Sequence, residues 1–437
     1  MRSKSLFAFD IYLLTSTLSL IVIGILFIYS SGVTSTGELF STEYLRQIVW
    51  AATGLILLVA LAFVDYGRLE GLSLYLYAGV MAALVITLLF GRVVNGARSW
   101  IGIGNLGVQP SEFAKLATIL LLARFLNNHR TSIHRLRTFV AGFGISLAPV
   151  ALILLQPDLG TALVFPPIYL LMAFAAGARL RHVLYVVLLA LITFVLAGLP
   201  AWETHIRAES VPVVRIVSDP RIAILVLLSV ATVALLSLVG LFLIKRRYFY
   251  WILYGASLAG ASLVSALGAL RVLRQYQIMR LIVFLDPYVD PRGAGWNIIQ
   301  SVTAVGSGGP FGKGFLRGTQ SHYQYLPQQS TDFIFSILAE EWGFLGSLLV
   351  FGLFLLLMLR GLHIAATAKD GYASLVATGI VGLIFLHFLV NVGMAMGIMP
   401  ITGIPLIFLS HGGSALWTGM MSVGILMSIY LHRFRYS

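Results

Sequence analysis

The sequence predicts an all-α polytopic membrane protein, and two properties of the chain carry this prediction. Of its 437 residues, 59% are hydrophobic and only 10% are charged, and the mean hydropathy is +0.94, far from the charge content of a soluble globular domain. Apolar runs of about 20 residues, each long enough to cross a bilayer as a helix, recur along the whole chain. Because every backbone polar group inside a bilayer must be satisfied within its span, a helical bundle is expected.

The apolar runs predict about twelve transmembrane helices by the hydropathy rule. The first run is too long for a removed signal peptide and is too weakly followed by a cleavage site, so it is kept as a helix. The fourth run is short and carries Glu112 and Lys115 in its first turn, so its helix is expected to begin deeper in the membrane. The predicted spans lie near residues 10–31, 45–64, 71–91, 112–127, 138–155, 160–177, 182–199, 221–244, 248–270, 333–359, 372–394 and 405–432.

The basic residues predict the orientation, because most of them fall on one side of the membrane if the spans alternate. By the positive-inside rule that side is the cytoplasm, and both termini are then cytoplasmic. This topology accounts for most of the net charge of +13, and no nucleic-acid motif accompanies the charge. The residues concerned are Arg2, Lys4, residues 124–137, Arg179, Arg181, residues 245–247, residues 360–369, Arg433 and Arg435.

The segment 271–332 is the exception to the charge pattern and is expected to hold the chemistry of a single domain spanning residues 1–437. On the predicted topology this long loop is extracytoplasmic, yet cations outnumber carboxylates in it, which suggests an anionic ligand. The alternative is that long loops cross the membrane largely regardless of charge. Arg46 and Arg98 lie at the same predicted side. The charged residues of the loop are Arg271, Arg274, Arg280, Arg292, Lys313 and Arg317 against Asp286, Asp290 and Asp332.

Two carboxylates of this loop are the candidate acid–base groups. Each is followed by a proline in Asp286-Pro-x-x-Asp290-Pro, and a proline pushes the preceding residue out of the helical region. A carboxylate held in such a turn can act as a general base when a substrate proton lies within hydrogen-bond reach. The alternative is that both aspartates only form turns.

Other candidate residues are cations and a charged pair. Lys313 lies in a glycine-rich run, residues 306–314, which either offers backbone N–H groups to a phosphate or is a simple flexible loop. Glu112 and Lys115 lie three residues apart on one helix face, so they either pair with each other or line a polar cavity, since ionisable residues at such depth are functional candidates. The histidines show no metal spacing. A divalent cation, Mg²⁺, remains a candidate cofactor, bound through carboxylates and substrate phosphates. There are no cysteines, so disulfides and thiolate chemistry are excluded.

A series of motifs resembles one family along nearly the whole chain and in the expected order. The chain is thereby similar to the shape, elongation, division and sporulation (SEDS) proteins, and residues 391–394 and 400–405 resemble the elongation branch more than the division branch. His411 stands where the family usually has tyrosine. The motifs are Asn95-Gly-Ala-Arg98-Ser-Trp100, Gln109-Pro-Ser-Glu112-Phe-Ala-Lys115, Gln156-Pro-Asp158-Leu-Gly-Thr-Ala, Phe284-Leu-Asp-Pro-Tyr-Val-Asp290-Pro-x-Gly-x-Gly, Thr331-Asp-Phe-Ile-Phe335, Ala339-Glu-Glu341 and residues 405–414.

The resemblance implies a peptidoglycan glycosyltransferase that polymerises lipid II on the outer face of the bacterial cytoplasmic membrane. It implies that Asp290 is the essential aspartate, that Arg280, Glu112 and Lys115 surround a central cavity, and that the partner is a class B penicillin-binding protein transpeptidase. The family usually has ten spans, so residues 200–270 are expected to be an insertion with two extra helices.

The predicted reaction is glycosyl transfer with inversion, in which Asp290 is the general base. Arg280, Lys313 and Arg98 or Arg46 are expected to stabilise the departing pyrophosphate, whose negative charge grows in the transition state. Two alternatives stay open. A lipid II flippase would use the polar membrane residues as a translocation path, and a scaffold would only position a partner transpeptidase.

Overall fold

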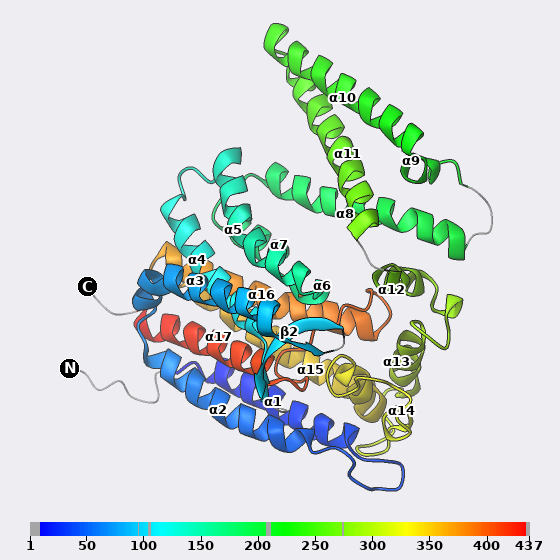
Figure 1. The fold of residues 1–437 in the computed structure, drawn as a ribbon. Coiled ribbons are helices and arrows are strands. Elements are labelled where there is room, and N and C mark those ends of the chain that lie inside the picture. Colours follow the sequence, from blue (N-terminus) through cyan, green and yellow to red (C-terminus); the bar gives the residue numbers. More distant parts are fainter. Residues whose placement is uncertain (1–8, 95, 104–105, 207–210, 273–274, 434–437) are drawn as a thin grey trace. The chain divides into compact units, whose positions relative to one another are not determined.

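The computed structural model describes residues 9–94, 96–103, 106–206, 211–272 and 275–433. Arg2, Lys4, Asn95, Arg274 and Arg435, used in the predictions above, lie outside the described residues. Figure 1 shows that the chain is mostly helical, as predicted. In chain order the elements are α1 (Ile11–Ser31), α2 (Glu43–Phe63), α3 (Tyr66–Phe90), β1 (Arg92–Val94), β2 (Ala97–Ile103), β3 (Leu106–Val108), α4 (Pro110–Asn128), α5 (Leu136–Leu155), α6 (Leu159–Ala162), α7 (Phe165–Ala175), α8 (Leu180–His205), α9 (Arg215–Ser218), α10 (Pro220–Leu243), α11 (Arg247–Val272), α12 (Gln275–Leu285), α13 (Trp296–Ser307), α14 (Thr319–His322), α15 (Ile334–Ala366), α16 (Gly371–Ala395) and α17 (Gly413–His432).

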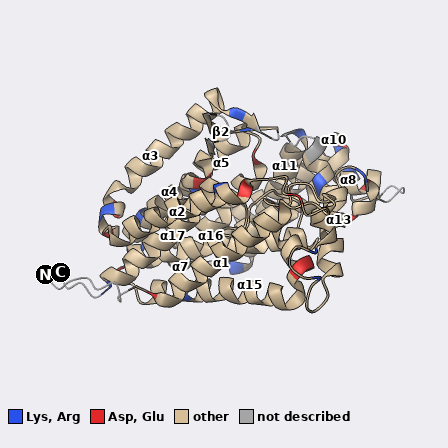
Figure 2. Ribbon diagram, turned by 90° about the horizontal axis from the view of Figure 1, so that it is seen from below, with Lys and Arg blue, Asp and Glu red and all other residues tan. Residues whose placement is uncertain are grey.

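Within the described residues, ten helices are long and apolar enough to cross a membrane. The predicted polytopic membrane fold is confirmed, whereas the count of twelve spans is not. One of the two remaining predicted spans is α4, which carries Glu112, Lys115 and Arg124. The other, near 160–177, is divided into α6 and α7, and α7 opens with two prolines that have no N–H to continue a helix. Figure 2 shows that most of the ribbon along the long helices is uncharged.

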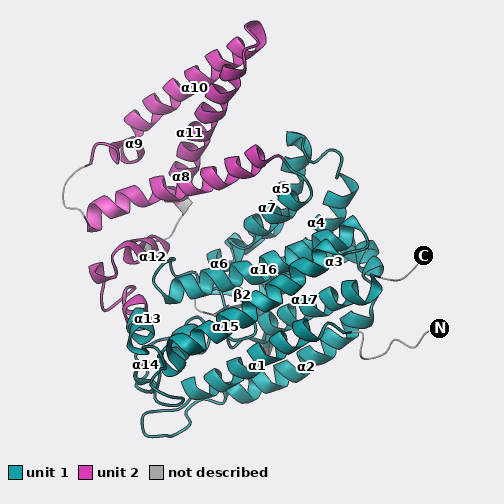
Figure 3. Cartoon of the chain, turned by 180° about the vertical axis from the view of Figure 1, so that it is seen from behind, with its two compact units in different colours: residues 1–178, 300–437 teal, residues 179–299 magenta. Residues whose placement is uncertain are grey.

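The chain forms two compact units, which Figure 3 distinguishes by colour. Unit 1 comprises residues 1–178 and 300–437, and unit 2 comprises residues 179–299. The predicted insertion at 200–270 therefore lies inside unit 2. Helix α13 begins in unit 2 and ends in unit 1.

Unit 1 is built around its most buried helices. Helix α17 packs against α2, α15 packs against α1 and α16, and α4 packs against α3 and α16. Close approach depends on small residues, as is usual between membrane helices. A Cβ at Gly424 of α17 would lie 2.6 Å from the carbonyl oxygen of Leu58 in α2. Glu112 and Lys115 of α4 are thereby enclosed by protein rather than by lipid.

A small antiparallel sheet joins α3 to α4 in unit 1, and the prediction of an all-helical chain missed it. Its strand order is β1-β2-β3, and Ile101 lies opposite Val108. The ring of Trp100 covers Gly107, where an added Cβ would lie 2.9 Å from a ring carbon. Strands β1 and β3 have only three residues each, and the seven residues of β2 do not alternate strictly between apolar and polar, so the sequence gives no clear strand signal.

Unit 2 contains a helical hairpin and the candidate catalytic turn. Helices α10 and α11 pack together, and α8 packs against α11 and α12. After α12 the chain forms a 3₁₀ turn, Pro287–Val289, before α13 begins. The segment 271–332, expected as a long extracytoplasmic loop, thus contains α12, α13 and α14 as local helices.

Candidate active site

The Asp-Pro-x-x-Asp-Pro segment folds into two consecutive side-chain-capped turns in unit 2. Asp286 precedes the 3₁₀ turn and its Oδ1 accepts a hydrogen bond from the backbone N–H of Tyr288 at 2.9 Å. The carboxylate of Asp290 accepts two bonds, from Gly293 N to Oδ1 at 3.0 Å and from Ala294 N to Oδ2 at 2.9 Å. Both aspartates therefore form turns, as one of the two interpretations predicted, and the turns hold their carboxylates in place.

The glycines that follow Asp290 are required by this geometry. A Cβ at position 293 would lie 2.2 Å from Oδ2 and 2.6 Å from Oδ1 of Asp290. A Cβ at position 295 would lie 2.1 Å from the carbonyl oxygen of Pro287. The Gly-x-Gly pair thus leaves room for the carboxylate and closes the turn around it.

The Asp290 carboxylate can still accept a proton from a ligand. An ionised carboxylate offers about four lone-pair positions, and the two backbone N–H groups occupy two of them. Asp290 is half-buried. Arg280 lies on α12, six residues before Asp286, and is exposed. Unit 2 therefore presents a fixed carboxylate and a guanidinium on consecutive elements.

Unit 1 contains a buried row of hydrogen-bonded polar side chains between α4 and α16. Lys115 Nζ lies 2.7 Å from Glu112 Oε1 and 3.0 Å from His387 Nε2. His387 Nδ1 in turn lies 2.8 Å from the carbonyl oxygen of Pro405. Lys115 is 1% exposed, Glu112 3% and His387 0%. The predicted pairing of Glu112 with Lys115 is confirmed by this distance.

The hydrogen-bond donors in this row determine which nitrogen of the His387 ring carries the proton. An ammonium group only donates, so His387 Nε2 accepts from Lys115. The ring proton then sits on Nδ1 and is donated to Pro405, which makes His387 neutral in this arrangement. His387 was not among the predicted site residues, because a single histidine in an apolar helix gives no signal of its partner 272 positions away.

Lys313 is paired rather than isolated. Its Nζ lies 2.6 Å from Glu340 Oε1 and 2.9 Å from Thr319 Oγ1, and its side chain is 29% exposed. The fully buried Glu340 carboxylate also accepts from the backbone N–H groups of Thr319 and Gln320. Through these hydrogen bonds, Glu340 holds residues 313–320 against the start of α15.

The neighbouring carboxylate, Glu341, fastens the same segment at a second point. It accepts from the hydroxyl of Ser30 and from the backbone N–H of Leu316 at 3.1 Å, and His322 Nε2 lies 3.5 Å away. Helix α15 is interrupted just beyond it, at Gly343 with φ +65°. The two glutamates were recognised in sequence only as part of a motif. Buried carboxylates in an apolar helix are the signal that identifies them.

Arg46 belongs to a third polar group in unit 1, at the start of α2. His411 stacks on Trp50 with ring centroids 4.9 Å apart, and its Nδ1 lies 4.0 Å from Glu43 Oε2. Burial lowers the pKa of the His411 imidazole; Glu43 acts in the opposite direction and Arg46 in the same direction. Arg46 is therefore close enough to influence this group electrostatically.

Arg98 lies on β2, opposite Val93 of β1, and is exposed. Its backbone N–H donates to the carbonyl oxygen of Gln156 at 3.2 Å, which ties the sheet to the end of α5. The structure thus brings Glu112 and Lys115 together, whereas Arg46, Arg98 and Lys313 belong to other local groups of unit 1. Asp290 and Arg280 belong to unit 2.

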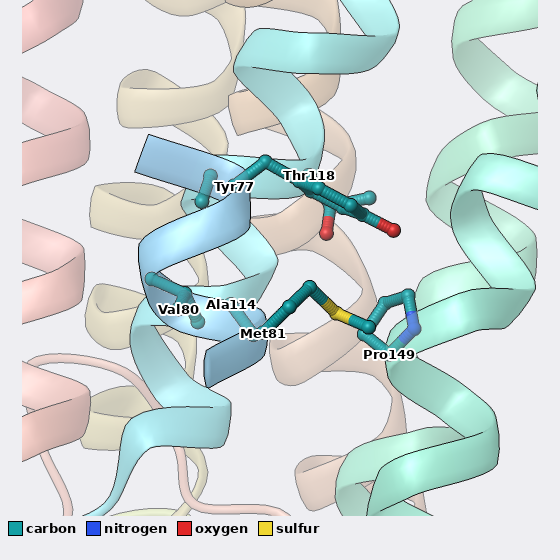
Figure 4. Close-up of a pocket in the computed structure, with 7 residues that line it drawn as sticks. Tyr77, Val80, Met81, Ala114, Thr118 and Pro149 are labelled. Atoms are coloured by element: carbon teal, nitrogen blue, oxygen red, sulfur yellow. The ribbon is translucent and has the colours of Figure 1, made fainter. Parts of the chain in front are cut away.

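A shallow hollow, too narrow to hold a ligand, adjoins α4 between α3 and α5. Figure 4 shows Tyr77, Met81, Thr118 and Pro149 around it. Its lining is mainly apolar, so it offers no acid–base group. Among the described residues, no three His, Asp or Glu side chains gather in a metal-binding arrangement.

Comparisons with known proteins agree along the whole chain. The family model described as "Cell cycle protein", for FtsW, RodA and SpoVE, matches residues 11–209 and 200–435. The peptidoglycan glycosyltransferase RodA of Treponema pallidum (strain Nichols) is 51% identical over 430 residues, covering 98% of this chain and 99% of that protein. The peptidoglycan glycosyltransferase MrdB of Escherichia coli (strain K12) is 35% identical over 388 residues, covering 89% of this chain and 85% of that protein.

A solved structure is similar at the level of the fold as well. It is described as "Structural coordination of polymerization and crosslinking by a peptidoglycan synthase complex", and one of its chains matches with a TM-score of 0.69 and 28% identity. The match covers 98% of this chain and 99% of that chain.

Proposed function

Since the chain belongs to the cell cycle protein family of FtsW, RodA and SpoVE, and its relatives include peptidoglycan glycosyltransferases, we propose that it polymerises lipid II into glycan strands. The chain is a peptidoglycan glycosyltransferase of this family. The 51% identical relative is a RodA, which agrees with the predicted elongation branch. A multi-pass protein of the bacterial cytoplasmic membrane, with its active site on the extracytoplasmic face, fits this role.

Asp290 is the general base of the proposed reaction, and its fixed carboxylate is the observation that carries the proposal. Asp290 takes the proton from the 4-hydroxyl of the acceptor N-acetylglucosamine. The resulting oxygen nucleophile attacks the anomeric carbon of the donor sugar from the face opposite the leaving group, so the configuration is inverted. The bond to the undecaprenyl pyrophosphate breaks, and the pyrophosphate departs with the electron pair. A base held by two backbone N–H groups starts near its reactive position, which reduces the cost of orientation.

Cations stabilise the leaving pyrophosphate in this proposal. Arg280 is the main candidate, because it is exposed and precedes the catalytic turn on the same unit. Arg46, Arg98 and Lys313 of unit 1 are the further cations proposed for this role, and Lys313 is already paired with Glu340. Charge that develops in the transition state is where such groups act most strongly. A Mg²⁺ ion, if used, would be held by Asp286 or Asp290 together with the pyrophosphate oxygens.

Glu112 and Lys115 complete the substrate-binding proposal from unit 1. A buried ion pair persists in a membrane protein only when its members are paired and hydrogen-bonded, and this pair has His387 as a further partner. Both side chains are buried in unit 1, so contact with a ligand would need the helices around them to open. The pair is proposed to contact the polar headgroup of the lipid substrate.

A class B penicillin-binding protein transpeptidase is the proposed partner. The similar solved chain comes from a complex described as coordinating polymerization and crosslinking, which supports a partner of this kind. Cross-linking of a strand as it is made requires the two enzymes to lie close together.

A gel assay with labelled lipid II tests the function. Purified protein, with and without the transpeptidase, is compared with Asp290→Ala and Asp290→Glu. A ladder of glycan from the parent that vanishes in both variants is expected, because a base of fixed reach does not tolerate a longer side chain. Lipid II transfer between leaflets without a ladder would instead support a flippase. No ladder and no transfer from the folded parent, with the transpeptidase present, would instead support a scaffold.

A further inference from the structure

Two exposed tyrosines stand out on the segment that precedes α15 in unit 1. Tyr323 is 57% exposed and Tyr325 is 47% exposed. Their rings are nearly parallel, with an interplanar angle of 23° and centroids 5.8 Å apart. Two aromatic rings this exposed and two positions apart place apolar ring surface in solvent, where a ligand with apolar faces can contact it.

The backbone beneath the two tyrosines is firmly held. His322 Nδ1 lies 2.8 Å from the carbonyl oxygen of Val33, and Gln329 Nε2 donates to the carbonyl oxygen of Ser31 at 2.7 Å. Leu326 is 2% exposed. Together with Glu340, which accepts from the segment's first N–H groups, these contacts anchor the segment on both sides of the tyrosines.

The residue between the tyrosines adopts an unfavourable conformation. Gln324 has φ +56°, a left-handed conformation that a residue with a side chain rarely adopts. Such strain persists only where the surrounding structure imposes it, and it is concentrated at functional positions. Gln324 lies between Tyr323 and Tyr325, whose rings stack on each other.

The composition of the same segment indicates the kind of ligand. Residues 318–331 contain no Lys, Arg, Asp or Glu, but they contain four glutamines. Gln324 and Gln328 are exposed beside the tyrosines. Amide groups both donate and accept hydrogen bonds, which matches hydroxyl and acetamido groups, and the π faces match the C–H faces of pyranose rings. A phosphate or carboxylate ligand would call for cations instead.

We propose that Tyr323 and Tyr325 form a platform on which the sugar rings of the glycan strand stack, with Gln324 and Gln328 contacting their polar substituents. This inference rests on the proposed function, because a polymerase must hold a strand of sugars between successive additions. The platform binds neutral amino-sugar chains. Its loss shortens the strands by increasing release of the product, while the chemical step continues.

The test compares three variants with the parent. Tyr323→Ala/Tyr325→Ala removes the platform, and Tyr323→Phe/Tyr325→Phe keeps the rings. Phe40→Ala is the matched control, because Phe40 is an exposed aromatic of unit 1 at 51% exposure outside the platform. Affinity for soluble glycan oligomers that lack lipid and peptide is measured by calorimetry, and strand length is measured on gels with lipid II.

The alanine double variant is expected to bind the oligomers about tenfold more weakly and to make shorter strands, while the phenylalanine variant and Phe40→Ala behave like the parent. Unchanged affinity and strand length in the alanine variant would overturn the proposal. An equal loss in Phe40→Ala, or a loss seen in bilayers but absent in detergent, would also overturn it in favour of membrane anchoring. Binding is measured without catalysis, so a parent that binds glycan but makes no strand from lipid II contradicts the proposed function rather than the platform.

Discussion

Substitution of Gly293 by alanine tests whether the position of the Asp290 carboxylate governs the reaction. The new Cβ would lie 2.2 Å from Asp290 Oδ2, whereas ordinary contact begins at 3.4 Å. The carboxylate is the end of a flexible side chain, so it moves by about 1 Å and the backbone remains in place. A displacement of this size costs about a hundredfold in rate, which corresponds to about 3 kcal/mol of transition-state stabilisation.

The same substitution is expected to change stability little. The two hydrogen bonds to the carboxylate weaken, but the turn is partly exposed and water replaces them, so the free energy of unfolding falls by about 1 kcal/mol or less. The rate of glycan formation from labelled lipid II and the thermal unfolding of the purified protein are measured on the same samples. The expected result is a large loss of rate with an almost unchanged unfolding temperature.

Gly306→Ala is the matched control for this experiment. Gly306 lies in α13 and has nothing within 4 Å of an added Cβ, so alanine should preserve the rate and, in a helix, stabilise slightly. If Gly293→Ala kept the parent rate while Asp290→Ala abolished it, the position of the carboxylate within the turn would not matter, and the reasoning would be wrong.

Two further predictions concern unit 1. His387→Ala leaves Lys115 without one hydrogen-bond partner in a buried site and should lower the free energy of unfolding by about 2 kcal/mol. His387→Gln can both accept and donate, so thermal unfolding of this variant should show most of the lost stability restored. Equal losses of stability in both variants would exclude the hydrogen-bonding role. Gly312→Ala should destabilise by about 2 kcal/mol, because φ is +79° and the Cβ would lie 2.1 Å from the backbone oxygen of Glu341; an unfolding temperature equal to that of Gly306→Ala would contradict this.

The membrane fold, the family and the candidate residues could all be predicted from the amino-acid sequence. Long apolar runs identify spans because lipid forces each helix to satisfy its own backbone. The spacing of Glu112 and Lys115 on one helix face predicted their pairing, since positions three residues apart are neighbours on any helix. The prolines after Asp286 and Asp290 predicted their turns for a similarly local reason.

The long-range partners of the charged residues became known from the folded structure. Nothing local connects Lys115 to His387 or Lys313 to Glu340, because these contacts arise where distant helices and segments pack together. The small sheet formed by β1, β2 and β3 escaped prediction because β1 and β3 have only three residues each and β2 does not alternate strictly between apolar and polar residues. The need for glycine at position 293 likewise follows from the space that the folded Asp290 turn leaves, which sequence spacing does not specify. Turns and pairs between nearby residues can therefore be predicted from sequence spacing. The contact partners of distant residues, and the space left around a side chain, depend on how the helices pack.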